Sequence, residues 1–383
     1  AAKENIGESR SELEKSVTNL ENCLQQIRQK YILDEKQCAM EAFREQFESG
    51  YTWINGFLRN VERFGNREAL AEPESGQVWT YTQLNAEANR FAHALLRSGL
   101  QKGDVVMAQL HNCPEFVFAY LACHKTGLVF CPVNFRLSAK ELSGCMDNSC
   151  PKVFLMESEN QENTDMALEW AKHAPAIILS TDSQSEHSYE KFADGCPETN
   201  PELPWDMYVF DETLRLFTSG TTGRQKSVCL TSINEVLSAH DVMINFPLSF
   251  TDRTMNTTPW FHRGGLHSGG ITPTLYAGGT VVVQRKFQAE QTLDYIEQQG
   301  LTFVIGVPNV LELMAEAQQK QPRNLHSLHG IVTMGSPLER ADCIRYQKIL
   351  TQRIFNGYGT TETFWNTFLR PDDLPENAGS AGR

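Results

Sequence analysis

Short apolar runs alternate with helical patterns along the sequence from about residue 51 onward. The apolar runs that we interpret as strands include residues 78–82, 104–110, 153–156, 303–305 and 330–334. The helical patterns include residues 84–96, 114–125, 139–147 and 290–299. Strands and helices that alternate in this way build a parallel sheet with helices on its faces. We therefore predict an α/β fold for residues 51–383.

Residues 1–50 have a different composition, because they are polar, poor in glycine and rich in Glu, Gln, Lys and Arg. Six apolar or aromatic residues recur at a 4-3-4-3-4 spacing, which places their side chains on one face of a helix. They are Leu13, Val17, Leu20, Leu24, Ile27 and Tyr31. Fewer than three heptads are short for a stable coiled coil. We expect an N-terminal helical extension, residues 1–50, whose stripe packs against its own domain. The alternative is a homodimer formed through this helix.

Length and charge limit the class of protein. A chain of 383 residues, 40% of them hydrophobic and 21% charged, has enough apolar material for two or three compact units. The formal net charge of −13 disfavours nonspecific binding to nucleic acid or to an anionic membrane. No apolar run reaches membrane-spanning length. Residues 181–206 are rich in Ser, Glu and Pro, so we expect a linker or a long loop there.

The 10 cysteines contain no Cys-x-x-Cys pair, and several lie in apolar runs such as residues 121–132. This pattern predicts reduced, mostly buried thiols rather than a disulfide framework or a zinc site. Together with the absence of a signal-peptide pattern, it favours a cytoplasmic protein.

Residues 216–228 have the composition of an oxyanion-binding loop. Two glycines, four hydroxyl side chains and two cations fall within ten residues. Glycines let a phosphate approach the backbone, hydroxyls donate hydrogen bonds, and cations supply charge. A capping box at Ser232 and Glu235 predicts a helix just beyond the loop, whose dipole would add to phosphate binding. The alternative is a polar turn between a strand and a helix.

The Walker P-loop, G-x-x-x-x-G-K-[ST], is the obvious competitor, and residues 220–227 differ from it at one position. Gln225 replaces the second glycine, and its side chain would crowd the backbone amides that hold the phosphates. This mismatch counts against a Walker fold.

Two later segments combine aromatic, glycine and polar residues. Residues 258–266 read Thr-Pro-Trp-Phe-His-Arg-Gly-Gly-Leu and contain His262. A histidine in an aromatic loop is more often a structural residue, and a metal pair of His262 with His267 lacks a third ligand at a telling spacing. Residues 357–362 read Gly-Tyr-Gly-Thr-Thr-Glu and follow the predicted strand 353–356.

In this order the three segments resemble the adenylate-forming superfamily, which includes acyl-CoA synthetases, peptide-synthetase adenylation domains and firefly-type luciferases. The resemblance covers about residues 51–383. It rests on Thr-Ser-Gly-Thr-Thr-Gly-x-x-Lys at 218–226, Pro-x-Phe-His at 259–262 and Tyr-Gly-x-Thr-Glu at 358–362. The first segment departs from the family pattern at Gln225, usually proline, and at Ser227, usually glycine. Residues 132–138 also resemble a stretch of acyl-CoA synthetases, which favours the CoA ligases.

The resemblance implies the large N-terminal domain of these enzymes, with stacked parallel-sheet subdomains flanked by helices and a smaller β-rich subdomain. It implies nucleotide binding by Thr218, Ser219, Gly220, Thr222, Gly223, Gly335, Ser336, Gly357, Tyr358, Gly359 and Thr360. It implies binding of the acid by Trp260, His262, Gly306 and Val307. The implied catalytic residues are Thr221, Lys226, Thr361 and Glu362.

Residue chemistry agrees with these roles in the last segment. The ring of Tyr358 offers adenine a stacking surface. Thr361 can donate a hydrogen bond to the α-phosphate, and Glu362 can bind Mg²⁺ directly or through water.

The implied reaction joins a carboxylic acid to ATP as an acyl-adenylate, releases pyrophosphate and then transfers the acyl group to coenzyme A, as in fatty acid metabolism. The family continues beyond the point matching Arg383 with a small C-terminal lid domain, which carries a lysine. We therefore expect this chain alone to bind nucleotide and to adenylate poorly. The alternatives are an adenylation domain that loads a carrier protein, a luciferase-like monooxygenase, and a lid-less nucleotide- or acyl-binding protein without catalysis.

Overall fold

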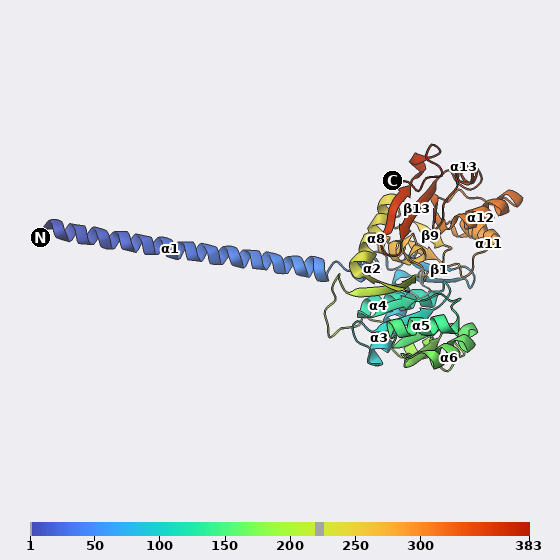
Figure 1. Ribbon diagram of the computed structural model, residues 1–383, viewed down its shortest axis with the longest axis horizontal. Helices are drawn as coiled ribbons and strands as arrows, with labels where there is room; N and C mark the ends of the chain where they lie inside the picture. Colours follow the sequence, from blue (N-terminus) through green and yellow to red (C-terminus); the bar gives the residue numbers. More distant parts are fainter. Residues whose placement is uncertain (1, 219–225) are drawn as a thin grey trace. The chain divides into compact units, whose positions relative to one another are not determined.

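The computed structural model describes residues 2–218 and 226–383, except for the side chains of residues 2–12 and 31–34. The chain forms two compact units, Ala1–Tyr51 and Thr52–Arg383. The first unit consists of one long helix, α1 (Ala2–Phe43), and a π-helical turn, η1 (Arg44–Ser49) (Figure 1).

The apolar stripe of α1 is exposed to solvent. The exposed fractions are 70, 48, 64, 54 and 52% for Leu13, Val17, Leu20, Leu24 and Ile27. Packing of the stripe against its own domain stays an expectation. The side chain of Tyr31 lies outside the described part of the structure.

The second unit is built on two sheets. Eight strands lie in the order β14-β13-β12-β11-β9-β10-β1-β2, and six lie in the order β6-β5-β3-β4-β7-β8. Neighbouring strands are parallel except in the pairs β1–β2, β13–β14 and β7–β8. The strands are β1 (Glu68–Glu72), β2 (Gln77–Thr80), β3 (Val105–Gln109), β4 (Val129–Pro132), β5 (Val153–Met156), β6 (Ile177–Ser180), β7 (Glu212–Thr218), β8 (Lys226–Thr231), β9 (Arg253–Asn256), β10 (Thr280–Val282), β11 (Phe303–Gly306), β12 (Gly330–Met334), β13 (Ile354–Thr360) and β14 (Phe364–Leu369).

This architecture confirms the predicted α/β class with parallel-dominated sheets. All strands of the described residues belong to these two sheets.

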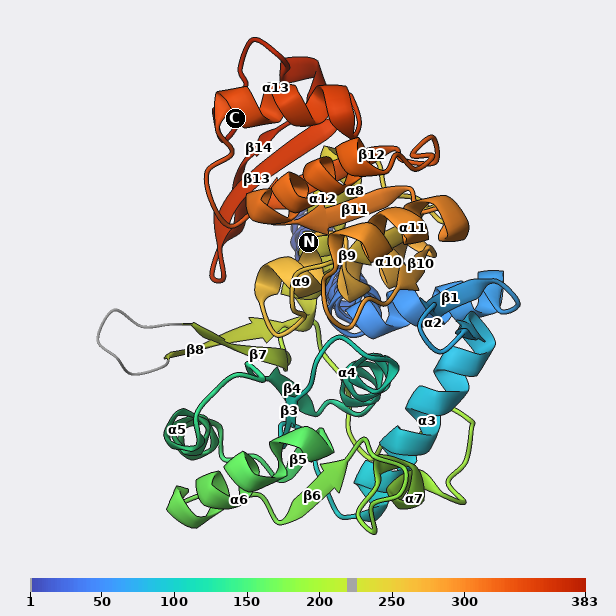
Figure 2. The same cartoon turned by 90° about the vertical axis from the view of Figure 1, so that its right-hand side faces the viewer.

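Helices cover the faces of both sheets (Figure 2). They are α2 (Trp53–Phe64), α3 (Tyr81–Arg97), α4 (Pro114–Thr126), α5 (Ala139–Ser149), α6 (Gln161–Trp170), α7 (Tyr189–Ala193), α8 (Ser232–Asn245), α9 (Arg263–His267), α10 (Ile271–Ala277), α11 (Ala289–Gln299), α12 (Pro308–Lys320) and α13 (Arg340–Ile349), with 3-10 turns η2 (Ser158–Asn160) and η3 (Pro371–Asp373).

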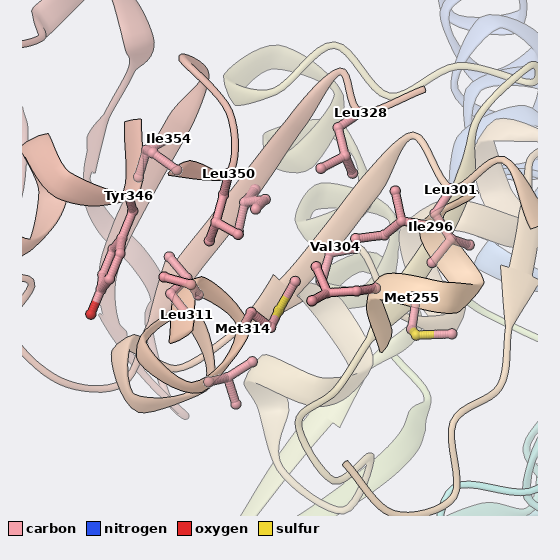
Figure 3. Close-up of a cluster of buried hydrophobic side chains, with 14 of the residues drawn as sticks. Met255, Ile296, Leu301, Val304, Leu311, Met314, Leu328, Tyr346, Leu350 and Ile354 are labelled. Atoms are coloured by element: carbon pink, nitrogen blue, oxygen red, sulfur yellow. The ribbon is translucent and has the colours of Figure 1, made fainter. Parts of the chain in front are cut away.

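The core lies between the sheets and these helices. One face of the eight-stranded sheet packs against α11, α12 and α13, and Figure 3 shows this layer with Met255, Val304 and Ile354 from the strands. The opposite face packs against Val242 of α8 and against Phe246, which directly follows α8. In the six-stranded sheet, Phe130 contacts the aromatic rings of α4 on one face, and the other face packs against α5. Burial on both faces explains why these strands are continuously apolar in sequence.

Two predicted boundaries were wrong for reasons of capping. The predicted strand 78–82 ends at Thr80, because Thr80 and Gln83 form a capping box that starts α3. The box predicted at Ser232 and Glu235 is formed one residue earlier, where the Thr231 backbone N–H donates to Asn234 Oδ1 at 2.9 Å. The predicted loop joins two antiparallel strands, β7 and β8, and the predicted helix, α8, begins at Ser232 directly after β8.

Residues 181–206 form a loop within one sheet rather than a linker between domains, because β6 and β7 both belong to the six-stranded sheet. The short helix α7 lies in this segment, and its Tyr189 packs edge-on against Phe91 of α3. All cysteines have free thiols. Most are buried, as predicted, and the exposed ones are Cys23, Cys38, Cys150 and Cys229. Among the described residues, no helix is both long and apolar enough to cross a membrane.

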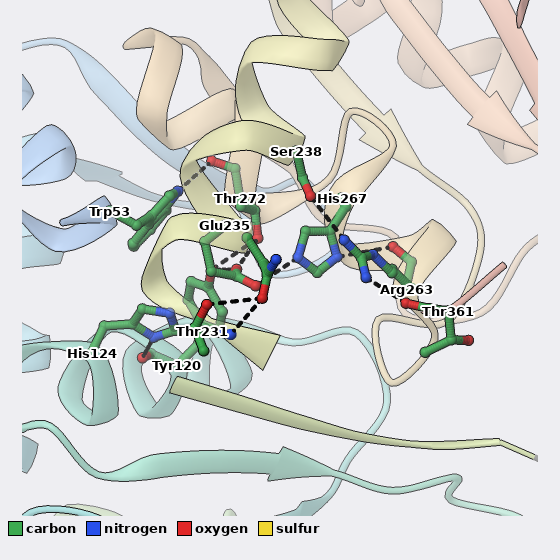
Figure 4. Close-up of polar contacts among 11 residues, drawn as sticks. Trp53, Tyr120, His124, Thr231, Glu235, Ser238, Arg263, His267, Thr272 and Thr361 are labelled. Carbon is green, nitrogen blue, oxygen red and sulfur yellow. Dashed lines mark hydrogen bonds and ion pairs between the residues drawn. The ribbon is translucent and has the colours of Figure 1, made fainter. Parts of the chain in front are cut away.

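A buried carboxylate connects the helices that meet between the two sheets (Figure 4). Glu235 of α8 is fully buried. Its Oε1 lies 2.8 Å from His267 Nε2 on α9. Its Oε2 accepts hydrogen bonds from Tyr120 of α4 at 2.6 Å and from Thr272 of α10 at 3.2 Å. The carboxylate therefore holds four helices together.

Electrostatics keep this carboxyl group ionised. Burial alone would raise the pKa of Glu235, but the charge and hydrogen bond of His267, the charge of His124 and the hydroxyl of Tyr120 lower that pKa to about 2. His267 Nδ1 lies 3.2 Å from the carbonyl oxygen of Arg263.

We predict that Glu235→Gln lowers the stability of the fold in a pH-dependent way. The pKa of Glu235 is depressed in the folded state, so the carboxylate stabilises the fold above pH 4.5 and loses this effect as pH falls towards 2. Urea unfolding at pH 7 should show a loss of roughly 3 kcal/mol. The difference from wild type should shrink below pH 4.5. The matched control is Glu316→Gln on the surface of α12, and a difference independent of pH would contradict the assignment.

Candidate functional site

The three sequence segments meet at the carboxyl ends of the parallel strands, where α/β proteins place their ligand sites. Three cavities adjoin there, of about 240, 220 and 310 Å³. The first two share His262 and Thr361 as lining residues. The last two share Gly335, Gly357 and Gly359. The cavities therefore form one connected row.

The hairpin cavity, of about 240 Å³, lies at the base of the β7–β8 hairpin. Its lining residues are Pro132, Val133, Asn134, Leu137, Phe217, Thr218, Phe261, His262 and Thr361. The segment 132–138, noted in the sequence, thus reaches the site. Thr218 pairs with Lys226 across the hairpin, and Lys226 is exposed. Five predicted residues, Ser219, Gly220, Thr221, Thr222 and Gly223, lie outside the described residues.

The central cavity, of about 220 Å³, lies between α9 and the β13–β14 hairpin. Its lining residues are His262, Arg263, Gly264, Ser268, Met334, Gly335, Gly357, Gly359, Thr360, Thr361, Phe364 and Trp365. Sequence reasoning missed several of these, including Arg263, Ser268 and the two aromatic residues. The arginine beside His262, in a segment otherwise apolar and rich in glycine, was the available signal.

The tyrosine cavity, of about 310 Å³, has Tyr358 on its wall. Its lining residues are Gly335, Ser336, Pro337, Leu338, Asn356, Gly357, Tyr358, Gly359, Gly379, Ser380 and Ala381. Tyr358 exposes 55% of its surface, so its ring is accessible to a ligand. The predicted nucleotide residues of strands β12 and β13 are therefore neighbours in space.

Gly359 and Phe364 fix the tip of the β13–β14 hairpin. A Cβ atom at Gly359 would lie 1.5 Å from the carbonyl oxygen of Phe364, so only glycine fits there. Phe364 has a φ of 63°, which is uncommon for a residue with a side chain. Backbone strain of this kind often accompanies functional sites. Between the two residues lie Thr361, half-buried, and Glu362, exposed.

His262 faces two of the cavities, and its ring lies tilted against that of Phe261, with ring centroids 4.2 Å apart. The ring is accessible through the cavities, but the surrounding protein removes enough hydration to lower the pKa of His262. A lowered pKa favours the neutral imidazole, which can accept as well as donate a hydrogen bond.

Arg263 connects α9 to α8 and to the β13–β14 hairpin. Its Nη1 donates to the carbonyl oxygen of Thr361, and its Nη2 donates to Ser238 Oγ at 3.0 Å (Figure 4). Its guanidinium also lies 5.3 Å from the ring centroid of Phe364. Burial lowers the pKa of Arg263, and the nearby carboxylates act in the opposite direction.

Two asparagines hold the loop that carries His262. The side chain of Asn112, after β3, accepts from the backbone N–H of Trp260 at 2.9 Å. The side chain of Asn256, at the end of β9, donates to the carbonyl oxygens of Gly264 and Ser268 at 2.9 and 3.0 Å. Both asparagines are buried, and sequence reasoning missed both.

Three predicted acid-binding residues lie away from the cavity walls described above. Trp260 exposes only 1% of its surface and packs edge-on against Phe116, which places it in the core rather than in a pocket wall. Gly306 is buried at the end of β11, where a Cβ atom would lie 2.8 Å from Thr257 Oγ1. Val307 packs against the core layer of the eight-stranded sheet.

A larger hollow, of about 570 Å³, lies elsewhere, between β2, α3 and α7. Its wall includes Arg90, which already pairs with Glu87 and Glu198. In the described part of the chain, His111, Glu157 and Glu159 form one group of potential metal ligands. The guanidinium of Arg285 already pairs with Glu157, so this group forms an ion-pair network.

Solved structures share this fold. The anthranilate CoA ligase AuaEII, solved in complex with anthranoyl-AMP, has a TM-score of 0.79 and is 21% identical, covering 87% of this chain and 63% of that one. The inhibitor-bound N-terminal domain of FACL13 from Mycobacterium tuberculosis also has a TM-score of 0.79 and is 25% identical, covering 87% of this chain and 82% of that domain.

Sequence comparison adds the family. The indoleacetate–CoA ligase of Aromatoleum aromaticum is 32% identical over 334 residues, which are 86% of this chain and 64% of the ligase. A feruloyl-CoA synthase of an Amycolatopsis species is 29% identical over 315 residues, which are 82% of this chain and 61% of the synthase. The chain thus spans about three-fifths of the length of these curated relatives. The family model for AMP-binding enzymes matches residues 57–383, and the chain therefore belongs to the AMP-binding enzyme family.

Proposed function

We propose that this chain is the nucleotide- and acid-binding part of an acyl-CoA synthetase-like ligase. Such an enzyme activates a carboxylic acid with ATP as an acyl-adenylate and transfers the acyl group to coenzyme A. The observation that carries the proposal is the row of three adjoining cavities with shared walls. One reaction that joins an acid to the α-phosphate of a nucleotide needs adjoining sites for the base, the acid and the phosphates.

Each cavity has the chemistry for one part of this reaction. The tyrosine cavity suits adenine, because Tyr358 offers an aromatic face beside glycine backbone. The central cavity suits the acid, since it lies between that site and His262. The hairpin cavity suits the phosphates, with Thr218 on its wall and Lys226 paired to it across the hairpin. Thr361 lines both the central and the hairpin cavities, where the acid and the α-phosphate would meet.

Glu362 fits the role of a magnesium ligand. It is exposed and adjoins Thr361, which lines two of the cavities. Mg²⁺ in such sites typically takes one or two carboxylates together with phosphate oxygens and waters. When bound, Mg²⁺ would neutralise phosphate charge, and the chain would supply Glu362 as its anchor.

The relatives support a CoA ligase more than the alternatives. Their names include CoA ligases for indoleacetate and ferulate, and a fatty acid–[acyl-carrier-protein] ligase of Streptomyces coeruleorubidus represents the carrier-protein alternative at 30% identity. We propose on the same basis that the whole protein has this activity, acts in fatty acid metabolism and is located in the cytoplasm. The weak adenylation expected of this chain alone stays a prediction.

We predict that Tyr358→Ala weakens AMP binding about tenfold, because base stacking on an aromatic ring contributes roughly 1–3 kcal/mol. Isothermal titration calorimetry with AMP measures this. The matched control is Tyr208→Ala, at an exposed tyrosine outside the three cavities. If Tyr358→Ala leaves the AMP affinity unchanged, the assignment of the tyrosine cavity to adenine is wrong.

Glu362→Ala should weaken binding of ATP in the presence of Mg²⁺, and it should leave AMP binding without Mg²⁺ within about threefold, because only the metal-dependent contact is lost. Glu316→Ala is the control. Equal losses with and without Mg²⁺ would show that Glu362 does not act through the metal.

We also propose that α1 mediates a homodimer through its exposed stripe. A second copy of the helix carries the same 4-3-4-3-4 spacing, so two stripes can cover each other. We predict that Leu20→Glu shifts the chain to a monomer in sedimentation experiments, while Gln25→Glu, off the stripe, has no effect. The proposed dimer is wrong if the wild-type chain sediments as a monomer at about 100 µM, which is a high working concentration for a protein.

A further inference from the structure

The wall of the central cavity contains two buried polar side chains that its apolar and glycine residues do not explain. Arg263 exposes 7% of its surface and Ser268 exposes none. Both residues line the cavity. Arg263 Nε and Ser268 Oγ each lack a hydrogen-bond partner in the described part of the chain. Buried polar groups without partners are rare in proteins and usually have a functional reason.

The charge of Arg263 is also not paired by direct contact. Its two hydrogen bonds go to neutral oxygens, those of Thr361 and Ser238. The carboxylates that act on it electrostatically are Glu235, Asp241 and Glu362, and none of them forms an ion pair with it. The carboxylate of Glu235 is engaged by His267 instead. A buried cation without a contacting anion is costly, so an anionic ligand group at this wall would offset that cost.

The rest of the cavity restricts the size and shape of the ligand. Its volume is about 220 Å³, which is below the roughly 300–1,000 Å³ of ordinary ligand pockets. Glycine backbone forms much of the wall, and Phe364 and Trp365 stack against each other at its edge, with ring centroids 4.6 Å apart. These features suit a compact body, flat or short, rather than a long chain.

From these observations we infer that the acid taken by this site carries a second carboxylate, which Arg263 and Ser268 bind at the wall of the central cavity. The substrate class is then a compact dicarboxylic acid. One carboxylate is activated near Thr361, and the other accepts hydrogen bonds at the α9 side of the cavity. Arg263 is the specificity-determining residue. This inference rests on the proposed function, because it assumes that the central cavity receives the acid.

The test uses pairs of non-hydrolysable acyl-sulfamoyl adenosines that differ only in the second carboxylate. The hexanoyl analogue is compared with the adipoyl analogue, and the benzoyl analogue with the 4-carboxybenzoyl analogue. The dissociation constant of each for the 383-residue chain is measured by calorimetry. We expect at least one dicarboxylic member to bind about tenfold more tightly than its partner, because charge-assisted hydrogen bonds to a buried guanidinium are strong. A third analogue carries the monoamide of adipic acid, so that a neutral amide replaces the second carboxylate. If the site requires charge and not merely a hydrogen-bond acceptor, this analogue should lose most of the tighter binding of the adipoyl analogue.

Substitutions in the cavity wall test which residues cause the preference for the dicarboxylic analogue. In Arg263→Met, the ratio of the two dissociation constants should fall to about one. In Ser238→Ala, which removes a hydrogen bond of the guanidinium but keeps its charge, the ratio should be retained. Ser268→Ala is a smaller perturbation and should reduce the ratio about threefold. If Arg263→Met does not fold, the result for Ser268→Ala tests the inference alone.

The outcomes separate this inference from the proposed function. If the chain binds AMP and both members of each pair equally well, the proposed function stands and the second carboxylate is refuted. A preference that survives in both Arg263→Met and Ser268→Ala also refutes it. If neither AMP nor any analogue binds, the proposed function itself fails.

Discussion

The buried carboxylate of Glu235 is the interaction on which the arrangement of the site depends. It joins α8 to His267 on α9, to Tyr120 on α4 and to Thr272 on α10. The six-stranded sheet packs against α4, whereas α8 covers the eight-stranded sheet. One carboxylate thus connects helices that belong to different sheets. Because α9 begins directly after His262, its position sets where that histidine and Arg263 lie.

Sequence patterns predicted the elements of the fold well where burial is complete. The strands expected at 153–156 and 330–334 coincide with β5 and β12, because apolar runs buried on both faces leave little ambiguity. The start of α8 was misjudged for the opposite reason. Glu235 has the position of a capping residue, but its side chain turns inward to His267, and no local pattern indicates a partner 32 residues away.

The same distinction holds for the site. Segments with a strong local composition, such as residues 258–262 and 357–362, do meet in space. Residues that act through tertiary contacts were missed, because Asn112 lies 148 residues from the Trp260 amide that it holds. Trp260 shows that an aromatic residue in a segment of this kind is equally suited to the core, since it is buried there against Phe116.

The shared wall of the tyrosine and central cavities consists of Gly335, Gly357 and Gly359. A Cβ atom at Gly359 would lie 1.5 Å from the Phe364 carbonyl oxygen and one at Gly357 2.9 Å from Trp365 Nε1, so a side chain at either position would displace residues that line the central cavity. Arg263, Ser268 and Trp365 line the central cavity and not the tyrosine cavity, so a substitution of one of them can alter the central cavity without altering the shared glycine wall. The glycine wall therefore constrains two cavities together, whereas the opposite wall constrains only one.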